Sequence, residues 1–291
     1  MINLDEWERG GNFLGFREHD VFYRYDPADH EVLLCLHGFP TASYDFKKVW
    51  GPLSRDFSML SFDMIGYGLS AKPVDFPYTT ATQVDVLQAL LSHLDVKRVH
   101  ILSHDYGNTI IQELLARQGE GRVDFEIETI CFLNGALFPE THRPILAQKL
   151  LIGRFGFLFG RLVPNIAFAK SLASVFGPET QPTAAELTDF TELFRRNGGR
   201  NIWHILIQYM RERTVHRERW VTALQAMKQK FLLINGSDDP VSGRHLVKRF
   251  RELIPGQTNI IELPGIGHFP HFECPDIFLE KYREFQGLET A

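Results

Sequence analysis

The sequence predicts an α/β fold built on a mostly parallel sheet of eight strands, with an all-helical segment inserted after the sixth strand. Short β-rich runs alternate with longer amphipathic segments, which is the pattern of βαβ units. The runs VLLCLH and VHILS are continuously apolar, as expected of central strands buried on both faces. From Phe138 to about Ala226 the alternation stops and helix-compatible residues dominate. We therefore expect a core domain of residues 1–137 and 227–291 and a helical cap of residues 138–226.

The expected elements follow from these runs in chain order. The strands are residues 13–19, 21–25, 32–37, 58–63, 98–103, 129–134, 230–235 and 259–263. The clearest helices are residues 43–53, 82–94, 107–117, 243–253 and 276–286. An insertion at the carboxyl edge of a parallel sheet lies where ligands bind in such folds, so we expect the cap to cover the functional site.

Composition excludes several classes of protein. The chain has 291 residues, with 31 Lys and Arg against 36 Asp and Glu, a formal net charge of −5. Nucleic-acid binding needs clustered cations, so nucleic acid is not an expected partner. The three cysteines, Cys35, Cys131 and Cys274, show no C-x-x-C spacing, which argues against a disulfide framework or a zinc site. We expect neither a metal nor an organic cofactor, and the sequence does not indicate an oligomeric state.

The N-terminus has no basic region followed by an apolar stretch, so we expect no signal peptide and a cytoplasmic location. No apolar segment reaches the roughly 18 residues of a membrane-spanning helix. The nearest candidate, residues 145–176, is interrupted by charged residues and a proline. A lid over an apolar pocket is the favoured interpretation of this stretch, and a segment lying on a membrane surface is the alternative.

The segment VHILSHDYGNTIIQELL predicts a strand, a tight turn and a helix, with Asp105 at the apex of the turn. This is the context of a nucleophile elbow, usually written G-x-S-x-G, here flanked by Ser103 and Gly107. The apex of an elbow has a positive φ, which Asp tolerates better than most residues. The alternative is that Asp105 only caps the helix that follows it.

Three further strand ends carry polar groups that fit such an elbow. The loop after LCLHG and the residue after the nucleophile supply oxyanion-hole amides in enzymes of this type, so the N–H groups of Phe39 and Tyr106 are the candidates. In FLLINGSDDP, Asp239 is the candidate acid and Asp238 its alternative. In ELPGIGHFPHF the candidate base is His268, and the alternative is the histidine three residues later. The order nucleophile, acid, histidine at successive strand ends strengthens each assignment.

These motifs resemble the α/β hydrolases of the epoxide hydrolase and haloalkane dehalogenase branch, in which the nucleophile is an aspartate. Within that branch the chain is most similar to the mesoderm-specific transcript family. That closer resemblance rests on LHGFPTASYDF, LSHDYG, NGALFPETHRPILAQKLL and QYMRERTVHRERWV, and covers most of the chain from about residue 30. It implies the α/β-hydrolase fold with a cap, and a small apolar substrate with water as the second reactant.

An aspartate at the elbow indicates displacement at an sp³ carbon. A carboxylate attacking an acyl carbon would form an anhydride, whereas attack on an sp³ carbon gives a stable alkyl ester. Water activated by His268, which Asp239 orients, would then hydrolyse the alkyl-Asp105 ester. The residue type at position 105 therefore argues against esterases and lipases.

The leaving group distinguishes the two enzymatic interpretations. A ring-opening epoxide develops an alkoxide and benefits from an O–H donor that protonates it. Tyr209 is the only tyrosine of the expected cap. Its position resembles that of the cap tyrosine in epoxide hydrolases. Those enzymes usually carry a second cap tyrosine, for which this chain has no counterpart. The dehalogenase pattern usually has Trp after the nucleophile and Asn in the oxyanion loop, where this chain has Tyr106 and Phe39. Trp203 and Trp220 could still donate an indole N–H to a halide, although a large aromatic residue in a helical cap more often serves packing.

Epoxide hydrolysis is the favoured function and haloalkane dehalogenation the second. A non-catalytic binding protein on a hydrolase fold is the third, since a fold does not fix a function. Besides Trp203, the expected contacts of a substrate are His37 and Phe138. Eight of the 24 phenylalanines lie between Phe138 and Phe194, which predicts an apolar inner face of the cap.

Overall fold

The computed structural model describes residues 2–289 and has the expected architecture. Eight strands form one sheet in the order β1-β2-β4-β3-β5-β6-β7-β8. Their bounds are β1 Gly11–Phe16, β2 His19–Asp26, β3 Val32–Leu36, β4 Ser58–Phe62, β5 Arg98–Ser103, β6 Glu126–Phe132, β7 Lys230–Gly236 and β8 Ile260–Leu263. The strand predictions are confirmed to within a few residues.

The sheet is antiparallel only at one side. β1 pairs with β2, and β2 with β4, in antiparallel register, while all other neighbours are parallel. The carboxyl ends of β3 and of β5 to β8 therefore meet at one edge. Every residue of β3 and β4 is buried, which explains their unbroken apolar runs.

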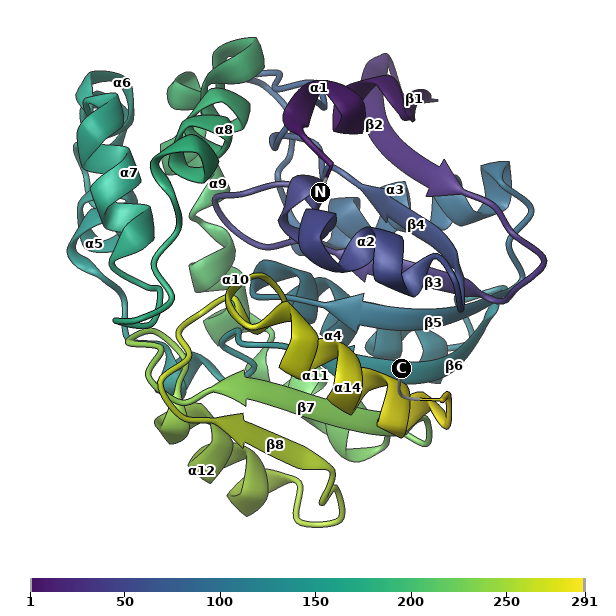
Figure 1. Cartoon of the computed structure of the whole chain (residues 1–291). Coiled ribbons are helices and arrows are strands. Elements are labelled where there is room, and N and C mark those ends of the chain that lie inside the picture. The colour runs from purple at the N-terminus through teal and green to yellow at the C-terminus, as the bar shows by residue number, and fades with distance from the viewer. Residues whose placement is uncertain (1, 290–291) are drawn as a thin grey trace.

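Helices cover both faces of the sheet (Figure 1). α2 (Lys47–Leu53) and α14 (Pro275–Gln286) pack on one face, and α3 (Thr80–His93), α4 (Tyr106–Gly119) and α11 (Arg217–Gln225) lie behind the sheet in this view. α12 (Arg244–Leu253) follows β7, and a short 3-10 helix, η1 (Ser43–Phe46), precedes α2. The five helices expected from the sequence are confirmed. Two short helices were not expected, α1 (Leu4–Arg9) and α13 (Pro270–Glu273), because one or two turns give little periodicity.

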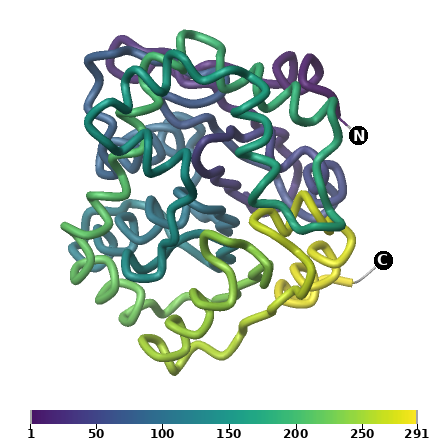
Figure 2. The backbone as a smooth tube through the Cα atoms, turned by 90° about the vertical axis from the view of Figure 1, so that its left-hand side faces the viewer, coloured from purple at the N-terminus to yellow at the C-terminus, as the bar shows by residue number. Residues whose placement is uncertain are grey.

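Between β6 and β7 the chain forms helices and no strand. They are η2 Pro139–Thr141, α5 Leu146–Ile152, α6 Gly156–Leu162, α7 Asn165–Ala173, α8 Ala184–Arg195, η3 Arg196–Asn201, α9 Trp203–Leu206, α10 Tyr209–Val215 and α11. The helices α5 to α9 of the insertion lie beyond the carboxyl ends of the parallel strands and face the viewer in Figure 2. α11 packs against the core helix α4, so the expected domain boundary at residue 226 stays a prediction. No helix within residues 2–289 has the length and apolarity to cross a membrane.

Candidate active site

Asp105 occupies the apex of a sharp turn between β5 and α4. Its backbone has φ +47° and ψ −108°, a region that non-glycine residues rarely adopt and that costs free energy. The turn is held by the Asp105 N–H, which donates to the Asn134 carbonyl at 2.8 Å. The Asp105 side chain makes no capping hydrogen bond to α4, so it does not serve as an ordinary N-cap.

Three glycines surround this apex because their neighbours leave no room for a side chain. A Cβ on Gly107 would lie 2.8 Å from the Leu36 carbonyl oxygen. A Cβ on Gly38 would lie 2.4 Å from the Asp105 Cβ, and one on Gly135 would lie 2.6 Å from the Asp105 Cα. The flanking loops therefore approach the nucleophile candidate closely enough to direct backbone amides at it.

The two carboxylate oxygens of Asp105 have different surroundings. Oδ2 accepts the Phe39 N–H at 2.9 Å. Oδ1 lies 4.0 Å from His268 Nε2 and 3.9 Å from Arg213 Nη2. The Tyr106 N–H is the first of α4 and has no acceptor among residues 2–289. Oδ2 is therefore bound by one of the two predicted oxyanion donors, the Phe39 amide, and the role of the Tyr106 amide stays a prediction.

Asp239 is fully engaged with His268, as the motif order predicts. Its Oδ2 accepts from His268 Nδ1 at 2.7 Å, from Asn134 Nδ2 at 2.9 Å and from Ser242 Oγ at 2.7 Å. The alternative acid, Asp238, is exposed and pairs with Arg244 at 3.0 Å. The geometry therefore favours Asp239 over Asp238 as the partner of the histidine.

The Asp239–His268 pair stabilises the charged form of both groups. Burial alone would raise the pKa of Asp239, but the charge and hydrogen bond of His268 lower it to about 2. Burial alone would lower the pKa of His268, but the charge and hydrogen bond of Asp239, together with the charge of Asp105, raise it to about 9. His268 is therefore protonated at neutral pH.

A buried polar cluster lies behind this pair. Asp45, His104 and His271 each offer one ligand atom within 4.8 Å of the others, the one candidate metal cluster among residues 2–289. Burial lowers the pKa of His104 well below its ordinary value and that of His271 to about 3, and raises that of Asp45. Burial thus favours the neutral form of each group, and three ligands are fewer than the four of a structural zinc site. His271, the alternative base, packs in this cluster against Phe46 at 4.8 Å between ring centroids.

A narrow cavity of about 40 Å³ opens beside Asp105 and His268. Its walls are mostly apolar and come largely from the insertion; they include Ile145, Leu151, Phe168, Leu172, Val175, Trp203, Val241 and Phe269. Trp203, a predicted substrate contact, lines the cavity, and its buried Nε1–H has no acceptor within the described chain.

His37 and Phe138, the other two predicted substrate contacts, are absent from the cavity wall. His37 is held within its own loop, since its Nδ1 lies 2.9 Å from the Gly38 carbonyl and its Nε2 accepts the Met64 N–H at 3.1 Å. Phe138 is fully buried and packs against Phe250 in the core. The structure therefore corrects the expectation for both: they are structural residues close to the site.

Four aromatic rings pack above the nucleophile candidate. Tyr209 lies 4.3 Å from Tyr106 and 5.8 Å from Phe39 between ring centroids, and Tyr67 lies 6.4 Å from both Tyr106 and Phe39. The hydroxyls of Tyr209 and Tyr67 are buried and have no hydrogen-bond partner in the part of the chain described. Burial, and secondarily the charge of Asp105, raises the pKa of Tyr209 well above its usual range, and burial does the same for Tyr67. Both phenols stay protonated at neutral pH and can act as donors.

Arg213 is the functional candidate that sequence reasoning missed. It lies on α10 four residues after Tyr209, is only 2% exposed, and places its guanidinium 4.7 Å from the centre of the Tyr209 ring. Its Nε donates to Thr109 Oγ1 at 2.7 Å, and its buried Nη2, near Asp105, has no hydrogen-bond acceptor among residues 2–289. The i, i+4 spacing from Tyr209 was the available signal, since it places both side chains on one helix face.

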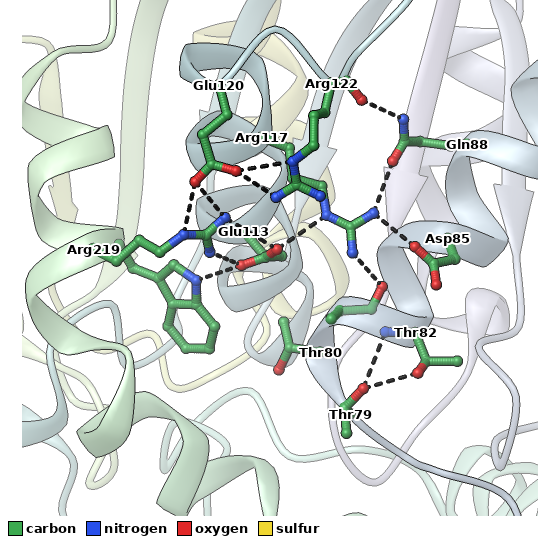
Figure 3. Close-up of polar contacts among 12 residues, drawn as sticks. Thr79, Thr80, Thr82, Asp85, Gln88, Glu113, Arg117, Glu120, Arg122 and Arg219 are labelled. Atoms are coloured by element: carbon green, nitrogen blue, oxygen red, sulfur yellow. Dashed lines mark hydrogen bonds and ion pairs between the residues drawn. The ribbon is translucent and has the colours of Figure 1, made fainter.

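Polar contacts fasten α10 and α11 to the core. Glu212 of α10 accepts from the Thr80 N–H at 2.8 Å and from its hydroxyl at 2.6 Å, at the start of α3. Figure 3 shows the larger network on α4, where the buried Glu113 carboxylate meets Arg117 at 3.0 Å, Arg219, and the indole N–H of Trp220 at 2.8 Å. These contacts fix the helix that presents Tyr209 and Arg213 to the site.

The sheet order, the turn after β5 and the polar strand ends together define an α/β hydrolase. The chain belongs to the alpha/beta hydrolase fold family, whose model matches residues 31–275. It is 37% identical to the mesoderm-specific transcript homolog protein of Bos taurus over 97% of this chain and 87% of that protein. It is 34% identical to the putative hydrolase LipZ of Mycobacterium tuberculosis, over 96% of each chain.

More distant relatives include proteins with a named reaction. A cis-3-alkyl-4-alkyloxetan-2-one decarboxylase of Shewanella oneidensis is 26% identical over 92% of this chain and 86% of its own. Among solved structures, the haloalkane dehalogenase DbeA of Bradyrhizobium elkani superposes with a TM-score of 0.79 at 20% identity, covering 95% of this chain and 97% of that one. That structural likeness establishes the shared fold.

Proposed function

We propose that the protein hydrolyses an apolar epoxide to a diol through a covalent alkyl-Asp105 intermediate. The observation that carries this proposal is the environment of the Asp105 carboxylate. One oxygen is bound by the Phe39 amide, and the other faces His268, Arg213 and the apolar cavity. A carboxylate held in this way is oriented for attack on carbon, with its second oxygen already in the oxyanion hole.

In the first step Asp105 Oδ1 attacks a ring carbon, the C–O bond breaks and the ring oxygen takes a proton from Tyr209. The Tyr209 phenolate then recovers a proton that originates on His268. Because Asp105 loses its negative charge on becoming an ester, one of the charges that raise the pKa of His268 disappears. Alkylation thereby helps to convert His268 from an acid into the base that the second step needs.

In the second step neutral His268 takes a proton from water, and the resulting hydroxide adds to the Asp105 carbonyl carbon. Negative charge develops on Oδ2, where the amides of Phe39 and Tyr106 stabilise it. Collapse breaks the bond to the alkyl oxygen and moves a proton to the diol, which leaves Asp105 ionised and His268 protonated, as at the start.

Arg213 supports the first step in this scheme. While Asp105 is ionised, the guanidinium compensates its charge in a buried site. As the ester forms, the negative charge passes to the ring oxygen and, once that oxygen is protonated, to the Tyr209 phenolate. The guanidinium, which has a free Nη2 and lies 4.7 Å from the centre of the Tyr209 ring, can stabilise it. The relative that acts on an oxetan-2-one is named for a substrate with a strained oxygen-containing ring, which supports an oxygen leaving group here.

Haloalkane dehalogenation is the second candidate, and Trp203 favours it. Its unpaired indole N–H lines the same cavity, where it could bind a departing halide. Two of the donors without acceptors are nevertheless hydroxyls, since both Tyr209 and Tyr67 have free O–H groups near the nucleophile. Hydroxyl donors match an oxygen leaving group, which needs a proton, better than a halide, which does not.

The experiment uses a His268→Gln variant, in which the ester should form and persist. Incubation with styrene oxide is expected to add the full mass of the epoxide, and peptide mapping should locate it on Asp105. Incubation with 1-bromobutane tests the second candidate, because it would leave a butyl ester and release bromide. The variant Asp105→Asn/His268→Gln is the control and should form no adduct.

Neighbouring aspartates supply a matched comparison for the acid. Asp239→Asn should abolish diol formation, whereas Asp238→Asn should preserve it, because only Asp239 contacts His268. A panel of epoxides and haloalkanes should also be incubated with the His268→Gln variant. If none of them modifies it, both enzymatic proposals are contradicted and a non-catalytic binding protein is favoured.

A further inference from the structure

The outer face of α5 to α7 exposes an unusual amount of apolar surface. Eleven large hydrophobic side chains are exposed among residues 2–289, and seven of them lie in this short stretch. They are Leu146, Leu150, Phe155, Phe157, Leu158, Leu162 and Ile166, hereafter the apolar face. Leu146, Leu162 and Ile166 are 71%, 73% and 66% exposed. Such a concentration of exposed apolar side chains indicates a site of interaction.

The charged residues of the segment that carries the apolar face all have one sign, although Glu192 of α8 lines a groove together with Ile166. Residues 141–178 contain five Lys and Arg and no Asp or Glu, although the whole chain has a net charge of −5. The five cations are exposed and form no ion pair with the described residues; they are Arg143, Lys149, Arg154, Arg161 and Lys170. A polar face rich in free cations beside exposed Leu, Ile and Phe is typical of helices that lie in the surface of an anionic bilayer.

The apolar face also leads toward the candidate active site. A groove of about 450 Å³ runs between Leu158, Leu162 and Ala167, with Phe168 and Trp203 in its wall. Phe168 and Trp203 also line the cavity beside Asp105. The groove and the cavity therefore share the side chains of Phe168 and Trp203.

We propose that the apolar face docks on an anionic lipid bilayer, with the exposed side chains of α5 to α7 entering the interface and the five cations binding lipid headgroups. Charge complementarity and the shared groove both favour this occupant. A lipid surface accepts the apolar side chains and the cations together, and an apolar substrate dissolved there would enter next to Phe168 and Trp203. The docking itself does not depend on which reaction Asp105 performs.

The test measures co-sedimentation of the full chain with vesicles of phosphatidylcholine alone and of phosphatidylcholine containing phosphatidylglycerol. We expect binding to the anionic vesicles that weakens at high salt, and little binding to the neutral ones. The variant Arg154→Gln/Arg161→Gln/Lys170→Gln should bind the anionic vesicles about 100-fold more weakly, at roughly fivefold per cation. The variant Leu158→Ser/Leu162→Ser/Ile166→Ser should lose at least about tenfold.

Matched controls remove the same residue types elsewhere on the surface. Arg55→Gln/Lys228→Gln/Lys248→Gln removes three other exposed cations, and Val74→Ser/Val215→Ser/Ile277→Ser removes three other exposed apolar side chains. Both should bind like the original chain. All substituted positions are exposed, so circular dichroism should show every variant folded.

Three outcomes would overturn the proposal. The first is a chain that binds no vesicle, and the second is equal binding by the face variants and their controls. The third is that the chain binds no vesicle but forms a dimer in sedimentation velocity, and that the variant Leu158→Ser/Leu162→Ser/Ile166→Ser is a monomer. That result would assign the apolar face to contact with a second copy of this chain.

Discussion

Arg213 Nη2 lies 3.9 Å from Asp105 Oδ1 in a site where both side chains are almost fully buried, although one residue follows β5 and the other belongs to the helical insertion. The insertion thus contributes a charge to the candidate active site as well as covering it. A buried cation whose partner becomes a neutral ester is well placed to stabilise the anion that the reaction creates.

Arg213→Gln should slow formation of the alkyl-Asp105 ester by about 10²–10³-fold, the usual loss for one charge-stabilising donor. The measurement is the rate of adduct formation in the His268→Gln background, followed by intact mass. Arg211→Gln, which changes an exposed arginine of the same helix, should form the adduct at the original rate. Equal rates for the two variants would remove Arg213 from the mechanism.

Tyr209→Phe should lower epoxide turnover by about 10²–10⁴-fold, because the ring oxygen would lose its proton donor. Tyr67→Phe tests whether the second free hydroxyl shares that task, and a further loss in the double variant would show that it does. Release of bromide from 1-bromobutane should be unaffected by either change and should instead depend on Trp203. Full epoxide turnover by Tyr209→Phe would exclude that tyrosine as the donor.

The free energy of unfolding should fall as the pH rises from about 6.5 to 9. The reason is that the pKa of His268 is about 9 in the folded chain and about 6.5 in the unfolded chain, so that only the folded chain keeps the proton over this range. The stabilisation is fully present below 6.5 and is lost above 9, and it is about 3 kcal/mol. Urea denaturation at several pH values measures it. In the His268→Gln variant the slope over this range should flatten, and an unchanged slope would assign the effect to another group.

Gly38→Ala should reduce activity by about 10²-fold or more, because its Cβ would lie 2.4 Å from the Asp105 Cβ and displace the nucleophile from the Phe39 amide. Gly51→Ala is the matched control, since nothing lies within 4 Å of the position that its Cβ would occupy. Initial rates with any accepted substrate give the comparison, and equal rates in the two variants would contradict the close packing at the elbow.

Glu113→Ala should destabilise the fold by about 3 kcal/mol, because Arg117 and the Trp220 N–H would lose their buried acceptor between α4 and α11 (Figure 3). Glu120→Ala, at an exposed position in the same network, should change the melting temperature little. Thermal unfolding by circular dichroism distinguishes them. Equal melting temperatures of the two variants would show that the buried Glu113 carboxylate stabilises the fold no more than the exposed Glu120 does.

The sequence was most informative where strand ends meet. Asp105, Asp239 and His268 each follow a strand of the parallel sheet, so topology alone brings them to one edge, and the structure places them there. Arg213 could not be found in this way, because its neighbours in MRERT are polar and a charged residue on such a helix is normally exposed. Tyr67 was overlooked for a related reason. The segment around it predicts a turn through its glycines, and turn residues are normally at the surface.

The contacts of the insertion divide it into two parts with different freedom to vary. α10 and α11 are bound to α3 and α4 through Glu212 and Glu113 and carry Tyr209 and Arg213, so changes there would alter the chemistry itself. α5 to α7 carry the apolar face and one wall of the cavity, but none of the proposed reacting groups. Changes in α5 to α7 should therefore alter which substrates enter the cavity, while α10 and α11 keep the proposed reacting groups in place. This makes α5 to α7 the segment to exchange between related chains when substrate specificity is engineered.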